Sequence, residues 1–210
     1  MKLILLGAPG AGKGTQADIV AAKLGIPTIS TGNILREAIR NGSEVGLRAK
    51  AFMDKGQLVP DDVVIGIVRD RVARADCANG FILDGVPRTI PQAEALEDAG
   101  VSFDHVVSIE IDDAVIEQRM TGRRVCSGCG ASYHITAHPP RKDGVCDHCG
   151  GELTTRADDA PETVRSRLQV FHRETEALKD FYGRLGKLSL VEGDRPIEEI
   201  SKAILTAIGA

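Results

Sequence analysis

The sequence predicts an α/β protein: a five-stranded parallel sheet flanked by helices, interrupted by two insertions. Short apolar segments with strand character alternate with longer segments of helical periodicity, which is typical of parallel sheets. A glycine-rich turn, residues 7–15, follows the first apolar segment and leads directly into the first helical one. The length of 210 residues suits one sizeable domain with insertions.

Five segments are expected to form the strands. They span residues 2–6, 27–30, 81–83, 105–111 and 187–191. Helical patterns include residues 13–24, 61–75 and 91–99. The first of these helices is closed by Gly25 and Pro27. A later helix is expected to start at Pro161, because proline is favoured in the first turn.

Two segments break the alternation and are predicted to be insertions. Residues 30–59 are helical in pattern and punctuated by glycines, whereas residues 122–159 carry four cysteines and show no helical periodicity. The core is then predicted to comprise residues 1–29, 60–121 and 160–210.

The composition limits the classes of function. A net charge of −4, 3% aromatic residues and no tryptophan argue against general nucleic-acid binding. The apolar start is too short for a signal peptide, and no apolar run approaches the ~20 residues of a membrane span. We therefore expect a cytoplasmic protein without a membrane partner. Cys77 is expected to be a free thiol in or near a helix end.

The turn at residues 7–15 nearly matches the phosphate-binding pattern G-x-x-x-x-G-K-[ST]. Gly7, Gly12 and Lys13 fit, but Gly14 stands where the hydroxyl residue belongs, and Thr15 comes one position late. Glycines allow backbone N–H groups to converge on an anion at a helix start, and Lys13 adds a charge for the outer phosphates.

Other polar residues extend this phosphate site. Asp84 ends a buried strand, where nucleotide-binding proteins place a carboxylate that orients Mg²⁺. Arginines lie in or beside the insertions and on the following helix: Arg36, Arg88, Arg119, Arg123, Arg156 and Arg167. Guanidinium groups grip phosphate oxygens, so this placement predicts two phosphate chains facing each other. No convincing catalytic base is found, and an acceptor that is itself a phosphate needs none.

The cysteines of the second insertion form two C-x-x-C pairs, Cys126/Cys129 and Cys146/Cys149, separated by sixteen residues. This spacing is typical of a closed Cys₄ zinc site. Four thiolates leave no open coordination position, so we expect a structural metal. Iron or cobalt would suit the same ligands.

With these residues the chain resembles the long-form bacterial adenylate kinases with a Cys₄ lid, members of the nucleoside monophosphate kinase family with a P-loop NTPase fold. The resemblance covers essentially the whole length. It rests on the opening with its Gly-Lys-Gly-Thr ending, on Ser30–Arg36, and on the segments 84–88, 89–93, 122–124 and 154–156. Asn33 and Val86 depart from the pattern, which usually has an acid and a phenylalanine there. We expect altered packing of the first insertion rather than lost activity.

The resemblance implies a role for each site residue. Residues 30–59 become the AMP-binding domain and residues 122–159 the lid. ATP would be bound by Gly10, Ala11, Gly12, Lys13, Gly14, Thr15, Arg119, Arg123, Ser132, Tyr133 and Arg195. AMP would be bound by Thr31, Arg36, Gln57, Leu58, Val59, Gly85, Val86, Pro87, Arg88, Gln92, Arg156 and Arg167. The catalytic set would be Lys13, Arg88, Arg123, Arg156 and Arg167, with Asp84 in the Mg²⁺ shell.

The implied reaction is MgATP + AMP = 2 ADP, catalysed by a monomer that maintains adenine nucleotide balance. Its cofactors would be Mg²⁺ with ATP and a structural Zn²⁺, and its partners would be ATP, AMP and ADP, with no nucleic acid. Two alternatives stay open. One is a UMP/CMP kinase, although such relatives generally lack the long lid. The other is a nucleotide-switched protein that uses its zinc ribbon for binding.

Overall fold

A five-stranded parallel sheet forms the centre of the protein, as the sequence predicts. The computed structural model describes residues 1–210. The strands are β1 (Lys2–Gly7), β2 (Thr28–Ser30), β3 (Phe81–Asp84), β4 (His105–Glu110) and β8 (Leu188–Glu192). Their order in space is β2-β3-β1-β4-β8, and every neighbouring pair is parallel. Each predicted strand matches an observed one to within a residue or two at its ends.

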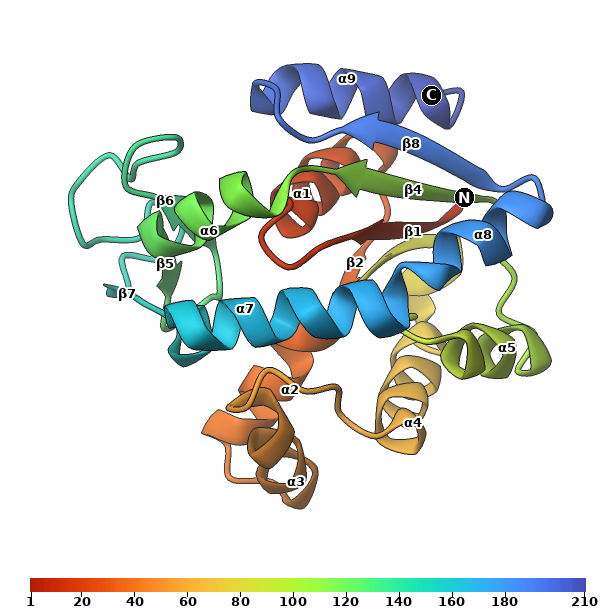
Figure 1. Ribbon diagram of the computed structural model, residues 1–210, viewed down its shortest axis with the longest axis horizontal. Helices are drawn as coiled ribbons and strands as arrows, with labels where there is room; N and C mark the ends of the chain where they lie inside the picture. The colour runs from red at the N-terminus through yellow and green to blue at the C-terminus, as the bar shows by residue number, and fades with distance from the viewer.

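Helices bury both faces of this sheet, which explains why its strands read as continuous apolar runs. Successive side chains of a strand point to opposite faces. Leu3 and Leu5 therefore pack with residues of α1 (Lys13–Leu24) and α9 (Ile197–Ala207). Ile4 and Leu6 pack on the other face, with residues of α4 (Asp61–Val72), α5 (Ile90–Asp98) and α8 (Ala177–Arg184). Figure 1 shows these two helical layers on either side of the strands.

The first insertion forms a helical arm. It contains α2 (Thr31–Arg40) and α3 (Glu44–Met53), which pack against each other and add no strand to the sheet. In Figure 1 the two helices project from the core in orange, below α7. The Ser43 hydroxyl accepts a hydrogen bond from the Gly46 amide and so caps the start of α3.

The second insertion forms a small lid with a sheet of its own. Strands β5 (Arg123–Cys126), β6 (Ser132–His134) and β7 (Leu153–Thr154) are antiparallel, in the order β6-β5-β7. Its buried cluster is limited to Cys126, Tyr133, Cys146 and Leu153. These strands were not predicted, because two to four residues are too few to show an apolar–polar alternation.

Two helices connect the lid to the core. The chain enters the lid through α6 (Asp113–Gly122) and leaves it through the turn η2 (Ala157–Asp159) and α7 (Pro161–Val170). A π-helical turn, η3 (Phe171–Thr175), continues α7 towards α8. Figure 1 shows α6 and α7 running from the core to the lid at the left of the view.

Two further predictions can be compared with the structure. The helix predicted at residues 61–75 is shorter, because α4 ends at Val72 and a separate turn, η1 (Ala75–Cys77), follows. Cys77 is a buried free thiol in that turn, as predicted. The structure contains no helix with the length and apolar character needed to span a membrane.

Candidate active site and metal centre

The glycine-rich turn lies between the end of β1 and the start of α1, at the carboxyl edge of the sheet. Gly10 and Gly12 adopt φ angles of +90° and +94°, which residues other than glycine rarely adopt. The Lys13 ammonium folds back over the turn and donates to the carbonyl oxygens of Gly7 and Ala8, each at 2.8 Å. The turn therefore presents its amides and one cation at the start of a helix.

Asp84 lies beside this turn, because β3 is the neighbour of β1 and Leu5 is paired with Asp84 in the sheet. Its Oδ2 is 3.8 Å from the point where a Cβ on Gly14 would lie. Burial lowers the pKa of the Lys13 ammonium to about 8, although the Asp84 charge acts to raise it. An anion bound at the turn would raise the pKa of Lys13 and so favour its charged form.

A cavity of about 400 Å³ opens above the turn and reaches the lid. It is bounded by the core, the arm and the lid together. All residues predicted to hold ATP, to catalyse transfer or to orient Mg²⁺ line it: Gly10, Ala11, Gly12, Lys13, Gly14, Thr15, Asp84, Arg88, Arg119, Arg123, Ser132, Tyr133, Arg156, Arg167 and Arg195.

A second cavity, of about 60 Å³, lies between the arm and the core. The residues predicted for AMP that line it are Thr31, Arg36, Gln57, Leu58, Val59, Gly85, Arg88, Gln92 and Arg167. Arg36, Leu58, Gly85, Arg88 and Arg167 line both cavities, so the two are adjacent. Pro87 lines only the larger of the two cavities.

Among the residues predicted to bind nucleotides or to catalyse transfer, Val86 is the one that lines neither cavity. Its side chain is fully buried in the core cluster beside α4 and α5. Apolar burial therefore governs this position, and the placement does not support a side-chain contact with a ligand.

Gln92 is 1% exposed and is held in a defined orientation. Its Nε2 donates to Asp61 Oδ1 at 2.7 Å, and its Oε1 accepts from the Arg88 amide at 2.7 Å. The carboxylate of Asp61 fixes which end of the amide is the donor. Each end keeps one further hydrogen-bonding position, so Gln92 can still offer a donor and an acceptor side by side.

Arginines from all three parts of the chain meet two aspartates at the base of the lid. Arg123 forms a two-pronged contact with Asp159, whose side chain is inaccessible to solvent. Arg167 Nη1 lies 2.8 Å from Asp158 Oδ2, and Arg36 Nη1 lies 4.0 Å from that oxygen. Burial and the neighbouring arginines lower the pKa of Arg156. The cluster concentrates positive charge between the two cavities.

Arg119 and Arg195 also line the large cavity. Arg119 donates to the Gly193 carbonyl at 3.0 Å and pairs with Asp194 at 3.1 Å. The Arg195 guanidinium pairs with Glu192 at 2.9 Å and faces solvent. Arg119 is therefore held with its planar group at the cavity wall, where it can stack on a flat ligand.

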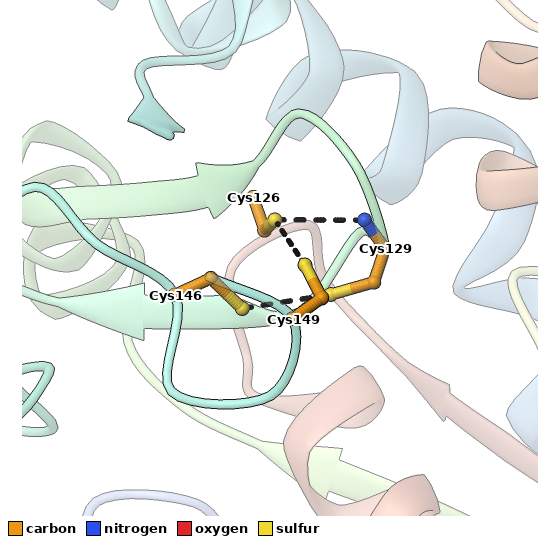
Figure 2. Close-up of side chains that lie close together, drawn as sticks. All are labelled: Cys126, Cys129, Cys146 and Cys149. Atoms are coloured by element: carbon orange, nitrogen blue, oxygen red, sulfur yellow. Dashed lines mark hydrogen bonds between the residues drawn. The ribbon is translucent and has the colours of Figure 1, made fainter. Parts of the chain in front are cut away.

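The four cysteine thiols of the lid converge, as Figure 2 shows. All four Sγ atoms lie within 4.8 Å of one another, with 3.4 Å from Cys126 to Cys149 and 3.6 Å from Cys129 to Cys146. A tetrahedral zinc with Zn–S bonds of about 2.3 Å places its sulfurs about 3.8 Å apart. The donor set therefore fits a four-coordinate metal with no open position.

The surroundings of Cys126 and Cys146 favour the thiolate form that a metal requires. The hydrogen bond from the Ala131 amide acts to lower the pKa of Cys129, but burial and the neighbouring thiols outweigh it and raise that pKa to about 12. The Cys129 amide lowers the pKa of Cys126 and outweighs the effect of burial. Burial alone would raise the pKa of Cys146, but hydrogen bonds from the Tyr133 hydroxyl and from nearby amides lower it to about 6. Tyr133, predicted as an ATP contact, thus directs its hydroxyl to the metal centre while it also lines the large cavity.

Several residues of the site were missed at the level of sequence. Asp61, Asp158 and Asp159 belong to no motif in the sequence. The sequence offered only weak signals for them. Asp158 and Asp159 lie between Arg156 and Pro161, and Asp61 directly follows Pro60. Gly130 and Gly150 were also overlooked, although one follows each C-x-x-C pair. Both have positive φ and donate to the carbonyl of the first cysteine, at 3.0 and 2.9 Å.

Comparisons with known proteins agree on one family. A profile described as adenylate kinase matches residues 5–187. The chain is 54% identical to an adenylate kinase of Caldicellulosiruptor bescii, over 100% of this chain and 99% of that protein. It is 52% identical to an adenylate kinase of Lachnospira eligens over the full length of both. It is 50% identical to one of Carboxydothermus hydrogenoformans, over 99% of each.

Proposed function

The chain belongs to the adenylate kinase family, and from this premise we propose how its residues carry out the transfer between ATP and AMP. The protein is an ATP:AMP phosphotransferase, which interconverts MgATP and AMP with two ADP. The assignment of residues rests on one observation: the two cavities are adjacent, and a group of cationic side chains lies where they meet. Arg36, Arg88 and Arg167 line both cavities, and Lys13 lines the larger one.

We assign ATP to the large cavity. Its phosphates lie on the amides of residues 10–15 and on Lys13, at the positive end of α1. The base lies towards Arg119, Arg195 and Ser132, where the guanidinium plane of Arg119 offers a stacking surface. Residues 122–159 act as the lid over this nucleotide.

We assign AMP to the small cavity, with residues 30–59 as its binding domain. Thr31, Gln57 and Val59 line that cavity and Arg36 and Arg88 mark its phosphate end. Gln92 offers one donor and one acceptor towards the base, a pattern that complements the N6 amino group and N1 of adenine. Its fixed orientation through Asp61 supports a preference for adenine over guanine and uracil, which present a carbonyl oxygen and a ring N–H at the corresponding positions.

The transfer itself needs positioning and charge neutralisation rather than a base. The acceptor oxygen belongs to a phosphate, so it is already anionic. Arg123, Arg156 and Arg167 neutralise the charge that spreads over the transferred group, and Lys13 holds the donor phosphates. Closure of the lid and the arm excludes water, which would otherwise accept the phosphoryl group.

Mg²⁺ accompanies ATP in this family. The oxygen donors at the turn suit this hard cation, because the Asp84 carboxylate faces Gly14 at the cavity wall. We propose Asp84 as the residue that orients the hydration shell of Mg²⁺. When bound, the ion neutralises phosphate oxygens and aligns the donor phosphates.

We further propose Zn²⁺ as the metal of the Cys₄ centre, with iron or cobalt as the alternatives that elemental analysis would distinguish. The monomeric state and the cytoplasmic location remain predictions. The cytoplasmic location is supported by the arrangement of four thiols as metal ligands, since a reducing compartment keeps such thiols unpaired.

The acceptor assignment is tested by an assay and by one substitution. ADP formation from ATP is expected to be fast with AMP and slow with GMP, CMP and UMP; comparable rates with GMP or UMP would reject the proposed role of Gln92. In Arg88→Ala, transfer should fall by about 10²–10³-fold, the usual cost of removing one donor to developing charge. Calorimetry should show weaker AMP binding and ATP binding within about twofold of wild type.

Arg69→Ala is the matched control, because Arg69 is an exposed arginine of α4 and lines neither cavity. It removes the same charge and should leave both nucleotides unaffected. Equal losses of ATP and AMP binding in Arg88→Ala would place Arg88 outside the acceptor site.

A further inference from the structure

One face of the arm helix α2 lies against the lid. Asn33, Arg36 and Arg40 are spaced three and four residues apart, so they share that face. Asn33 Nδ2 is 3.9 Å from where a Cβ on Gly130 would lie, and Arg36 Nη1 is 4.0 Å from Asp158 Oδ2. Arg40 Nη1 donates a hydrogen bond to the Ser127 carbonyl oxygen.

Ser127 lies inside the first C-x-x-C turn, so this bond joins the arm directly to the metal centre. The amides of Cys129 and Gly128 both face the Cys126 sulfur, at 3.5 Å for the Cys129 nitrogen. In a trans peptide the carbonyl points opposite to the N–H that follows it. The Ser127 carbonyl therefore points away from the sulfurs and outwards, because the Gly128 N–H points inwards.

The position of this carbonyl is fixed from two sides. The Ser127 amide and hydroxyl both donate to the Glu152 carbonyl, at 3.0 and 3.2 Å. The Gly130 amide closes the turn on the Cys126 carbonyl at 3.0 Å. A metal on the four sulfurs would hold this turn against the second one, and would thereby hold the acceptor of Arg40 in place.

We propose that Arg40 is a positioning residue that fastens the closed AMP-binding arm to the first C-x-x-C turn of the closed lid. The proposal rests on the assignment of the arm and the lid to AMP and ATP. Arg40 lines neither cavity, so it touches no nucleotide. The bond exists only when both parts are closed, and it adds to the affinity of a ligand that closes both. AMP by itself closes only the arm, so its affinity does not include this bond.

The proposal predicts a difference between two ligands. A mimic with two adenosines joined by a pentaphosphate chain occupies both sites, whereas AMP occupies one. In Arg40→Ala, calorimetry should show binding of the mimic weakened about fivefold, which corresponds to about 1 kcal/mol for one solvent-exposed hydrogen bond. The affinity for AMP should stay within about twofold of wild type.

Lys50→Ala is the control for charge, because Lys50 lies on α3 of the same arm and pairs only with Asp54. It should bind both ligands as wild type does. Unchanged binding of the mimic in Arg40→Ala, or an equal loss for AMP, would overturn the proposal.

A second comparison tests the role of the metal turn. In a protein that also carries Cys146→Ser and Cys149→Ser, Arg40→Ala should cause no further loss of affinity for the mimic. A persistent fivefold loss in that background would show that the metal turn is not what Arg40 engages. Failure of the wild-type protein to bind the mimic would instead reject the underlying two-site assignment.

Discussion

Lys13 is the only lysine among the residues that line the large cavity. Its ammonium bonds to the Gly7 and Ala8 carbonyl oxygens and lies beside Asp84. Lys13→Ala should lower turnover by about 10³-fold or more, because the charge that holds the donor phosphates is lost. The fold should survive, since about 1 kcal/mol per lost hydrogen bond shifts Tm by only about 2–4 °C in a chain of this size.

Lys23→Ala is the matched control for this substitution, because Lys23 is exposed at the last turn of the same helix. Steady-state turnover and melting curves should be recorded for both variants. A folded Lys13→Ala protein with turnover near that of wild type would refute the phosphate role.

At the scale of single residues, the sequence predicted those site residues that belong to a motif with a fixed spacing. Lys13 and the four lid cysteines belong to patterns whose chemistry requires those residue types at that spacing. Asp61 could not be found this way, because its partner Gln92 is 31 residues distant and a first-turn acid is ordinary in any helix. Val86 was assigned to AMP by the resemblance alone, and its full burial shows that its side chain packs in the core.

At the scale of elements, the lid is expected to depend on a metal at its four cysteines, because its own core is small. The buried cluster holds two cysteines, Tyr133 and Leu153, and Ile135 is 53% exposed. This cluster is too little to offset about 1–2 kcal/mol of backbone entropy for each ordered residue. A Cys₄ metal can supply on the order of 10 kcal/mol.

Replacing Cys146 and Cys149 by serine should therefore abolish metal binding and lower the melting temperature, while the core sheet stays folded. ATP should bind more weakly, because Arg123 and Arg156 stand at the two ends of the lid. The measurements are elemental analysis, melting and calorimetry, with Cys77→Ser as the control for a lost thiol. Unchanged melting in the double variant would contradict a structural metal. Loss of all turnover with an ordered, metal-free lid would point to a catalytic metal instead.

At the scale of the whole molecule, the central sheet could be predicted because its inner strands β3, β1 and β4 are buried on both faces and each strand is followed by a helical segment. The lid sheet could not, because its strands are short and are held by the cysteine turns rather than by an apolar face. The contact between arm and lid was also beyond the sequence. Arg40 and Ser127 are 87 residues apart, and nothing local marks either one.

His172 connects separate parts of the core and is expected to make the stability of the molecule depend on pH. Its Nε2 is 3.0 Å from Asp113 at the start of α6, and its Nδ1 is 2.9 Å from Glu176. Glu176 also pairs with Lys179, which reaches Glu110 at the end of β4. Hydrogen bonds to Glu176 and Asp113 raise the pKa of His172, whereas those from His172 and Lys179 lower the pKa of Glu176.

Because the pKa of His172 is higher in the folded protein, its contribution to stability is fully present below about pH 6.5 and is lost as the pH rises through the raised value. The pair is about half exposed, so the contribution should not exceed about 1 kcal/mol. His172→Gln should therefore lower Tm by about 2–4 °C at pH 5.5 and by much less at pH 9. With Asp113→Asn and Glu176→Gln in place, the same substitution should lose this pH dependence. An equal decrease in Tm at both pH values would show that the imidazole stabilises by packing rather than by charge.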